Sequence, residues 1–132
     1  MEKLKVLLVD DEEEFVSTLA ERLQLRDIVT LVATDGDQAL QMMEAEKPPV
    51  VVLDVMMPGM SGLDVLQEIR RRHPGAQTIL LTGHGSTKDG IKGMRMGAFD
   101  YLMKPVNIED LIKKMNDAFQ AADRGEHFEG DK

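Results

Sequence analysis

Short apolar runs alternate with longer amphipathic segments along the whole chain. The runs are Leu4–Val9, Ile28–Ala33, Val50–Leu53, Thr78–Leu81 and Phe99–Met103. Residues 6–9, 50–53 and 79–81 are apolar at every position. Continuous apolar runs of this length are typical of strands that helices cover on both faces of a parallel sheet. The pattern therefore predicts five buried strands.

The segments between the runs carry apolar residues at helical spacing. The last segment is the clearest, with one apolar face made of Ile108, Leu111, Ile112, Met115 and Phe119. Asn107 is placed to cap this helix, and Ser61 to cap the third, with Asp64 three residues on as in a capping box. A fourth helix is predicted from Thr87 to Met96, where two interior glycines cost about 1 kcal/mol each.

Five strand–helix units joined by short connections predict an α/β fold with a doubly wound parallel sheet. We expect a flavodoxin-like sheet of order 2-1-3-4-5 with helices on both faces. At 132 residues the chain has the length of one domain. We assign residues 1–122 to that domain and 123–132 to a polar C-terminal tail.

Composition and charge narrow the function. The formal net charge of −8 disfavours direct nucleic-acid binding, and the basic run Arg70–Arg72 falls at a helix end, where cations complement the dipole. The chain has no cysteine, which excludes disulfides and thiol chemistry. No apolar run approaches the about 20 residues that span a bilayer, and the start shows no leader pattern. We expect a cytoplasmic protein without membrane contact.

Polar residues follow four of the five strands at the point where each ends. Asp10 and Asp11 follow the first strand, Asp54 the third, Thr82 the fourth and Lys104 the fifth. Right-handed crossovers bring the carboxyl ends of parallel strands to one edge of the sheet, where such folds bind their ligands. We therefore expect these side chains to form one site.

Each residue alone has a simpler explanation. Acids at the start of a helix complement its dipole, and we assign Glu12–Glu14 only that role. Asp54 is the exception, because it ends an apolar run, where an unpaired charge is costly to bury. Several carboxylates at one edge favour a hard divalent cation such as Mg²⁺, and a carboxylate can be the nucleophile of phosphoryl transfer. Lys104 and Thr82 would then bind the transferred group.

Four motifs resemble the receiver domains of two-component response regulators. They are Asp10-Asp11, the run Asp54-Val55-Met56-Met57-Pro58-Gly59-Met60-Ser61-Gly62, the run Leu81-Thr82-Gly83-His84-Gly85, and the run Gly97-Ala98-Phe99-Asp100-Tyr101-Leu102-Met103-Lys104-Pro105. The resemblance extends from about Lys5 to Phe119. Four motifs in the same order and spacing are far more specific than a single short pattern.

The resemblance implies a role for each matching residue. Asp54 would be the phosphoacceptor, which receives its phosphoryl group from a histidine kinase or a histidine phosphotransfer protein. Asp11, Asp54 and the backbone carbonyl of Met56 would ligate Mg²⁺, with Asp10 acting on the metal through water. Thr82 would turn toward the phosphoryl oxygen and Lys104 would pair with it.

The same resemblance implies a conformational switch. Tyr101 matches the aromatic switch residue, and its movement with Thr82 would reshape a surface formed by the fourth helix, the fifth strand and the last helix. This surface would control a partner or an output domain, and it is the expected surface of a phosphorylation-dependent homodimer. The Lys104–Pro105 peptide bond is commonly cis in similar proteins. The motifs Gly83-His84-Gly85 and Gly97-Ala98-Phe99-Asp100 look most like those of receivers attached to transcriptional regulators. We therefore expect either a stand-alone regulator or a receiver excised from a larger DNA-binding protein.

Two alternatives stay open at this point. A Mg²⁺-dependent phosphohydrolase would also use an aspartyl nucleophile, but it needs an acid two residues later, where this chain has Met56. A flavodoxin-like cofactor protein needs a phosphate-binding loop after the first strand, where this chain has acids. We therefore favour a protein that catalyses only its own phosphorylation and dephosphorylation, and not an enzyme that acts on other substrates.

Overall fold

The computed structural model describes residues 3–83 and 87–125. Its strands are β1 (Lys5–Val9), β2 (Val29–Ala33), β3 (Val50–Asp54), β4 (Gln77–Thr82) and β5 (Asp100–Met103). Its helices are α1 (Glu13–Gln24), α2 (Gly36–Glu46), α3 (Gly62–Arg72), α4 (Thr87–Arg95) and α5 (Ile108–Asp123). Every predicted strand and helix is present, and the bounds predicted for the strands and for the fourth helix differ from the observed ones by at most one residue.

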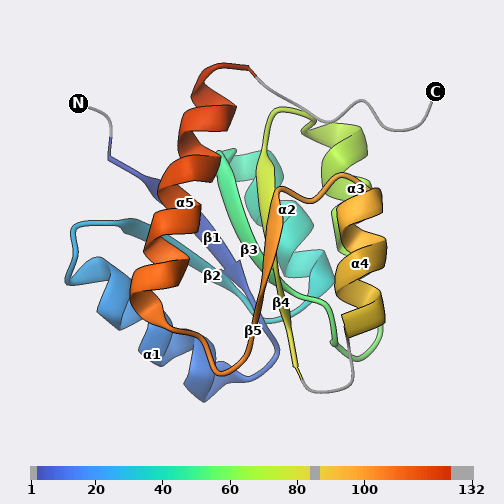
Figure 1. The fold of residues 1–132 in the computed structure, drawn as a ribbon, viewed down its shortest axis with the longest axis horizontal. Helices are drawn as coiled ribbons and strands as arrows, with labels where there is room; N and C mark the ends of the chain where they lie inside the picture. The colour runs from blue at the N-terminus through green and yellow to red at the C-terminus, as the bar shows by residue number, and fades with distance from the viewer. Residues whose placement is uncertain (1–2, 84–86, 126–132) are drawn as a thin grey trace.

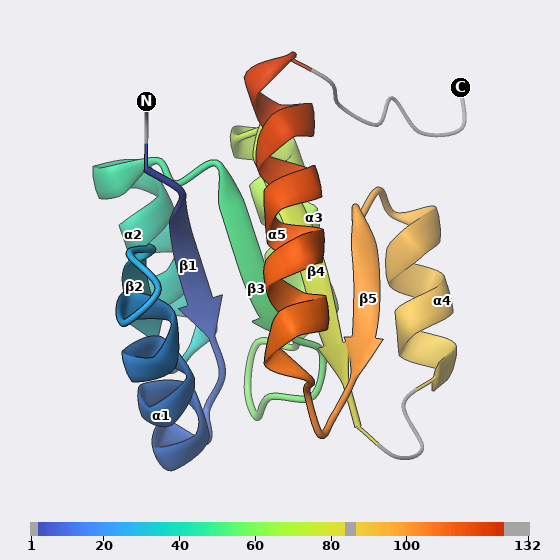
Figure 2. The same ribbon diagram turned by 60° about the vertical axis from the view of Figure 1, so that its left-hand side comes forward.

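The five strands form one parallel sheet in the order β2-β1-β3-β4-β5 (Figure 1). This order confirms the predicted doubly wound fold. All the strands point the same way, so their carboxyl ends lie along one edge of the sheet (Figure 2). The strand order reverses between β1 and β3, which is where folds of this type place their ligands.

Two apolar cores, one on each face, fix the sheet between its helices. Val6 and Leu8 of β1 face the core shared with α1 and α5, while Leu7 and Val9 face the core shared with α2 and α3. Successive strand side chains point to opposite faces, so a strand segment covered by helices on both sides carries apolar residues toward both faces. The continuous apolar runs of the sequence have this cause.

The helix ends follow the predicted capping. The Ser61 hydroxyl accepts a hydrogen bond from the backbone N–H of Asp64, whose carboxylate accepts one from the Ser61 N–H. Asn107 accepts a bond from the N–H of Asp110 at the start of α5. Helix α5 continues to Asp123, one residue into the segment assigned to the tail. The rest of that tail, from residue 126, lies outside the described residues.

Helix α4 lies closer to the sheet than a helix with side chains at every position could. Gly90 and Gly93 are buried on its inner face. A Cβ atom at Gly93 would lie 2.1 Å from Cδ1 of Leu80, and one at Gly90 would lie 3.2 Å from Cγ2 of Thr82. The two glycines, whose low helix propensity was their only visible property in the sequence, therefore serve close packing.

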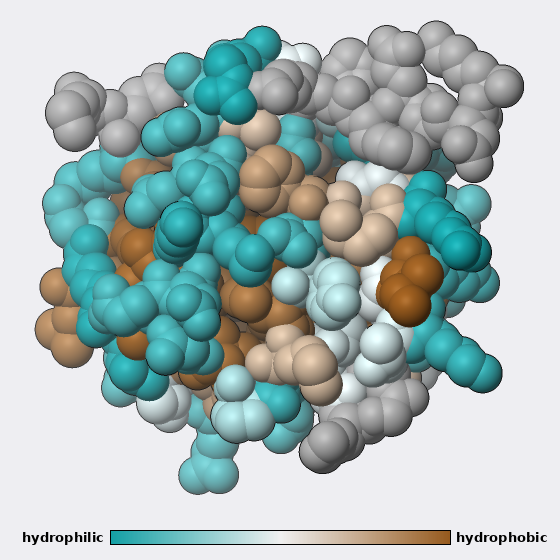
Figure 3. Space-filling view, viewed as in Figure 1, coloured by the Kyte–Doolittle hydropathy of each residue, from teal (hydrophilic) through white to brown (hydrophobic). Residues whose placement is uncertain are grey.

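The surface is mixed in character. On the face shown in Figure 3, polar side chains cover most of the area, with apolar patches between them. Within the described ranges, no helix has the length and apolar character that crossing a membrane requires.

One buried polar group gives a stability prediction. Thr78 of β4 is 1% exposed, and its Oγ1 has no hydrogen-bond partner among the described residues. An unsatisfied buried hydroxyl costs about 1–3 kcal/mol, so Thr78→Val, which keeps the shape, should stabilise the protein by about 1 kcal/mol. Urea denaturation should show a higher midpoint with an unchanged slope.

The control for this prediction is Thr30→Val in β2. The Oγ1 of Thr30 donates a hydrogen bond to the Ile28 carbonyl, so its removal should not stabilise the protein. A lower urea midpoint for Thr78→Val than for the wild type would show that the Thr78 hydroxyl is satisfied in solution.

Candidate functional site

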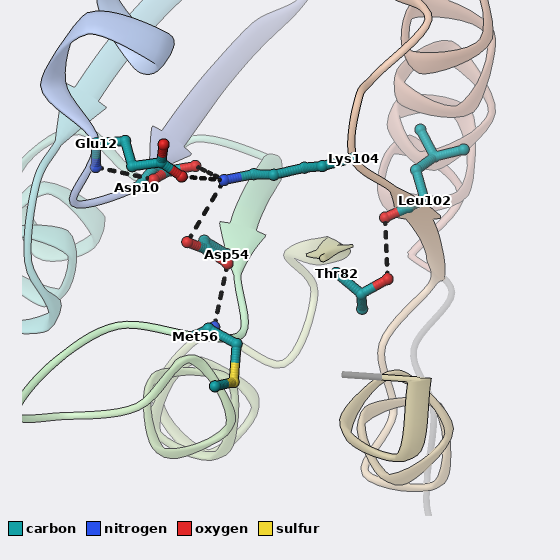
Figure 4. Close-up of polar contacts among 7 residues, drawn as sticks. All are labelled: Asp10, Glu12, Asp54, Met56, Thr82, Leu102 and Lys104. Carbon is teal, nitrogen blue, oxygen red and sulfur yellow. Dashed lines mark hydrogen bonds and ion pairs between the residues drawn. The ribbon is translucent and has the colours of Figure 1, made fainter. Parts of the chain in front are cut away.

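Side chains from three strand ends meet at the carboxyl edge of the sheet (Figure 4). Asp10 follows β1, Asp54 ends β3, and Lys104 follows β5. Asp10 and Asp54 are only 1% and 5% exposed, so the strands place both carboxylates largely out of water. The Lys104–Pro105 peptide is cis, as the resemblance predicts.

Lys104 is the cation of this site. Its Nζ donates to Oδ2 of Asp10 at 2.8 Å and to Oε1 of Glu12 at 2.9 Å, and it lies 3.6 Å from Oδ2 of Asp54. Burial by itself would lower the pKa of Lys104, but the hydrogen bonds to Asp10 and Glu12 and the nearby charges raise it above the usual range. Lys104 therefore stays charged beside the acids.

The Asp54 carboxylate is held in an unfavourable environment. Burial is the main cause that raises its pKa from 3.8 to about 6. A hydrogen bond from the backbone N–H of Met56 to Oδ1, at 3.1 Å, opposes this effect, while the negative charge of Asp10 adds to it. Lys104 lowers the pKa and Asp11 raises it by smaller amounts. Asp54 is thus ionised at neutral pH, but its ionised form is less stable than that of a carboxylate in water.

The acids at this edge fit a divalent cation. Asp10, Glu12 and Asp54 each offer a carboxylate oxygen, and the three oxygens lie within 4.8 Å of one another. Carboxylate oxygens are the ligands that Mg²⁺ prefers, and three carboxylates around one ammonium leave an excess of negative charge. Oxygen type, spacing and charge therefore all suit Mg²⁺.

The structure groups the acids differently from the sequence expectation. Asp11 is exposed and lies outside this group of three. Glu12 was assigned only to the helix dipole, yet its carboxylate binds Lys104, so that assignment is wrong for Glu12. The physical reason is local: Oδ1 of Asp10 accepts the Glu12 N–H at 2.9 Å, which turns the chain so that Glu12 faces the site. Metal ligation by Asp11 and by the Met56 carbonyl stays a prediction.

Thr82 and Tyr101 lie on adjacent strands next to α4. The Thr82 hydroxyl donates a long hydrogen bond of 3.5 Å to the Leu102 carbonyl (Figure 4). Tyr101 is half-buried against the core on the α4 side. Both residues contact the Gly90 position, since a Cβ atom there would lie 3.4 Å from the Tyr101 ring. Their switch roles stay predictions, and His84 and Gly85 of the threonine motif lie outside the described residues.

The site includes one further residue, Phe15, which the sequence did not indicate. The Nζ of Lys104 lies 4.4 Å from the centroid of the Phe15 ring. In the sequence, Phe15 belongs to the apolar stripe of α1. Helical spacing does not show which residue of that stripe contacts the β5–α5 connection. The contact depends on how α1 is placed against the β5–α5 connection.

The family of the chain follows from comparison with known proteins. The model of the response regulator receiver domain matches residues 6–116, which is most of the chain. The chain belongs to the response regulator receiver domain family. Response regulators with this domain act in two-component signalling systems. The four motifs that carry the resemblance all lie within residues 6–116.

Individual relatives agree with this family. The transcriptional regulatory protein CpxR of Klebsiella pneumoniae subsp. pneumoniae (strain HS11286) is 42% identical over 111 residues, which are 84% of this chain and 47% of that protein. The alkaline phosphatase synthesis transcriptional regulatory protein PhoP of Bacillus subtilis (strain 168) is 38% identical over 101 residues, 76% of this chain and 42% of that protein. The receiver domain spans about half the length of these relatives.

Solved structures match the fold closely. A response regulator receiver domain protein from Clostridium thermocellum aligns with a TM-score of 0.87 and 34% identity, covering 91% of this chain and 97% of that one. The receiver domain of NtrX from Brucella abortus aligns with a TM-score of 0.83 and 32% identity, covering 87% and 98%. The receiver domain therefore has the complete fold of its family.

Proposed function

We propose that this receiver domain accepts a phosphoryl group on Asp54 from the phosphohistidine of a histidine kinase or a histidine phosphotransfer protein, in a Mg²⁺-dependent reaction. The observation that carries the proposal is the state of Asp54. Its carboxylate is buried, its pKa is raised to about 6, and Lys104 lies 3.6 Å away. An ionised carboxylate that is poorly stabilised in the resting state is suited to be a nucleophile.

The proposed phosphoryl transfer to Asp54 is a simple displacement at phosphorus. An oxygen of the Asp54 carboxylate attacks the phosphorus, the P–N bond breaks, and the electron pair stays on the imidazole nitrogen, which later takes up a proton. The product is an acyl phosphate on Asp54. Lys104, released from Asp54, offers its ammonium group to the phosphoryl oxygens.

Asp10, Glu12 and Asp54 supply the oxygens that would hold Mg²⁺, with Asp11 and the Met56 carbonyl as the ligands that the resemblance implies. When bound, Mg²⁺ neutralises negative charge on the acids and on the transferred group. The phosphohydrolase alternative has less support, because the position of its general acid carries the thioether of Met56, 61% exposed, which has no proton to give.

The output follows from the residues behind the site. The hydrogen bond of Thr82 to Leu102 is long at 3.5 Å, so a phosphoryl group on Asp54 offers its hydroxyl a stronger acceptor. Thr82 and Tyr101 both face Gly90, and their movement would reshape the surface of α4, β5 and α5. The proposed binding partner of this surface is a second copy of the domain, or an output domain like those of the transcriptional regulators that the chain resembles.

The proposal is tested by intact mass spectrometry after incubation with acetyl phosphate and Mg²⁺. The wild type should gain one phosphoryl group and Asp54→Asn none, because an amide cannot form the acyl phosphate. EDTA should block the wild-type reaction. Asp117→Asn, which removes an exposed acid of α5, serves as the control and should be phosphorylated like the wild type. Phosphorylation that persists in Asp54→Asn would place the acceptor elsewhere.

A further inference from the structure

Four groups surround the ammonium of Lys104: the carboxylates of Asp10, Glu12 and Asp54, and the ring of Phe15. They differ in how strongly they can hold it. The Glu12 side chain is 64% exposed, and an ion pair in that environment is screened by water and contributes little. Asp10, Asp54 and the Phe15 ring remain as the three partners that water screens less.

The Phe15 ring is well placed for a cation–π contact. The ammonium lies 4.4 Å from the ring centroid, within the about 6 Å over which the negative face of an aromatic ring attracts a cation. The Lys104 side chain is only 18% exposed and Phe15 is half-buried against the α1 core, so little water competes. Desolvation strengthens contacts of this kind.

The ring differs from the acids in one respect that matters for the reaction. Any divalent cation held by Asp10 and Asp54 competes with Lys104 for the same two carboxylates. A cation bound to oxygen ligands does not compete for the face of a half-buried ring. Phe15 is therefore the partner that Lys104 keeps when its ion pairs are weakened.

We propose that Phe15 is a positioning residue, whose ring holds the Lys104 ammonium beside Asp54 when the carboxylates are engaged by a cation. This inference rests on the proposed function, since it assigns to Phe15 a part in the same reaction. It also gives α1 a role beyond packing: Glu12, which precedes the helix, and Phe15 of its first turn both contact one lysine of the β5–α5 connection.

A graded change of the ring electrons at constant shape separates this role from packing. Mono-, di- and trifluorophenylalanine, incorporated at position 15 alone, withdraw electrons from the ring stepwise and alter its size little. The rate of phosphorylation by acetyl phosphate at saturating Mg²⁺ should fall with each fluorine, by about twofold to fivefold in total. The melting temperature and the Mg²⁺ affinity should stay unchanged across the series.

Two controls accompany the series. Trifluorophenylalanine at Phe119, which packs against the same core from α5, should leave the rate unchanged. Phe15→Tyr keeps an electron-rich ring and should retain the rate, whereas Phe15→Leu should lower it as far as the trifluorinated ring does. A rate that does not change along the series, with the wild type phosphorylated normally, overturns the role of Phe15.

A second measurement keeps the inference separate from the proposed function. The mobility of the Lys104 ammonium, followed by ¹⁵N NMR in the Mg²⁺-loaded protein, should increase stepwise along the series. If the wild type accepts no phosphoryl group, the proposed function fails and this NMR result alone decides the contact. Unchanged Lys104 mobility in the trifluorinated protein would mean that the ring does not hold the ammonium.

Discussion

Gly62→Ala should destabilise the receiver domain by about 3 kcal/mol or more and abolish rapid phosphorylation. A Cβ atom at Gly62 would lie 2.2 Å from the carbonyl oxygen of Asp54 and 2.5 Å from Cα of Val55. Both atoms belong to the backbone, which cannot rotate away as a side chain can, so α3 or the end of β3 must shift. Thermal unfolding should show a melting temperature lower by about 10 °C or more.

The same shift should affect the site directly. Gly62 is the first residue of α3, and its N–H donates to the Val55 carbonyl at 3.2 Å, so this contact sets the position of the chain after Asp54. A displacement of about 1 Å at a reacting group can lower a rate by about 100-fold. The acetyl phosphate reaction of the folded fraction should slow by that order.

Gly75→Ala is the matched control for Gly62→Ala. Gly75 has no atom within 4 Å of the Cβ position among the described residues, and its backbone is not in the left-handed region. Its melting temperature and phosphorylation rate should remain close to those of the wild type. Wild-type stability in Gly62→Ala would show that α3 does not contact the β3 end as closely in solution.

Asp54→Asn should be more stable than the wild type at neutral pH in metal-free buffer. The pKa of Asp54 is about 6 in the folded protein and 3.8 ordinarily, so the folded state binds this proton more tightly than the unfolded state. The wild type therefore loses stability as the pH rises from 3.8 to 6 and does not regain it above 6. At 1.36 kcal/mol per unit of pKa, the loss is about 3 kcal/mol, and asparagine avoids it.

Urea denaturation in EDTA over this pH range tests the prediction. The two proteins should have similar stability near pH 3.8 and diverge up to about pH 6. Mg²⁺ should reduce the difference by stabilising the wild type more, since Asp54 is a proposed ligand. Asp117→Asn, at an exposed position, should show no such divergence. A less stable Asp54→Asn at pH 7.5 would mean that Lys104 compensates the buried charge fully.

The fold was predictable because its signals are local and consistent. Strands covered by helices on both faces carry continuous apolar runs, and these runs marked β1, β3 and β4. The capping boundary at Ser61 was equally visible, since a cap involves residues only three positions apart. The packing of α4 was not, because a glycine in a sequence does not show whether it weakens a helix or admits a neighbour.

The sequence by itself determined the parts of the site. The acids, the threonine and the lysine each end or follow a strand, and parallel topology requires strand ends to share one edge. Residue type and order were therefore enough to predict which strand ends meet.

Only the tertiary structure decided how these parts pair. It directs Lys104 to Asp10, Glu12 and the Phe15 ring, it leaves Asp11 exposed, and it buries Asp54 enough to raise the pKa of its carboxylate. Such choices depend on ångström-scale distances and on desolvation, which arise from the packing of α1 and the β5–α5 connection against the sheet. No local pattern of residues contains these quantities, because each is set by segments far apart in the chain.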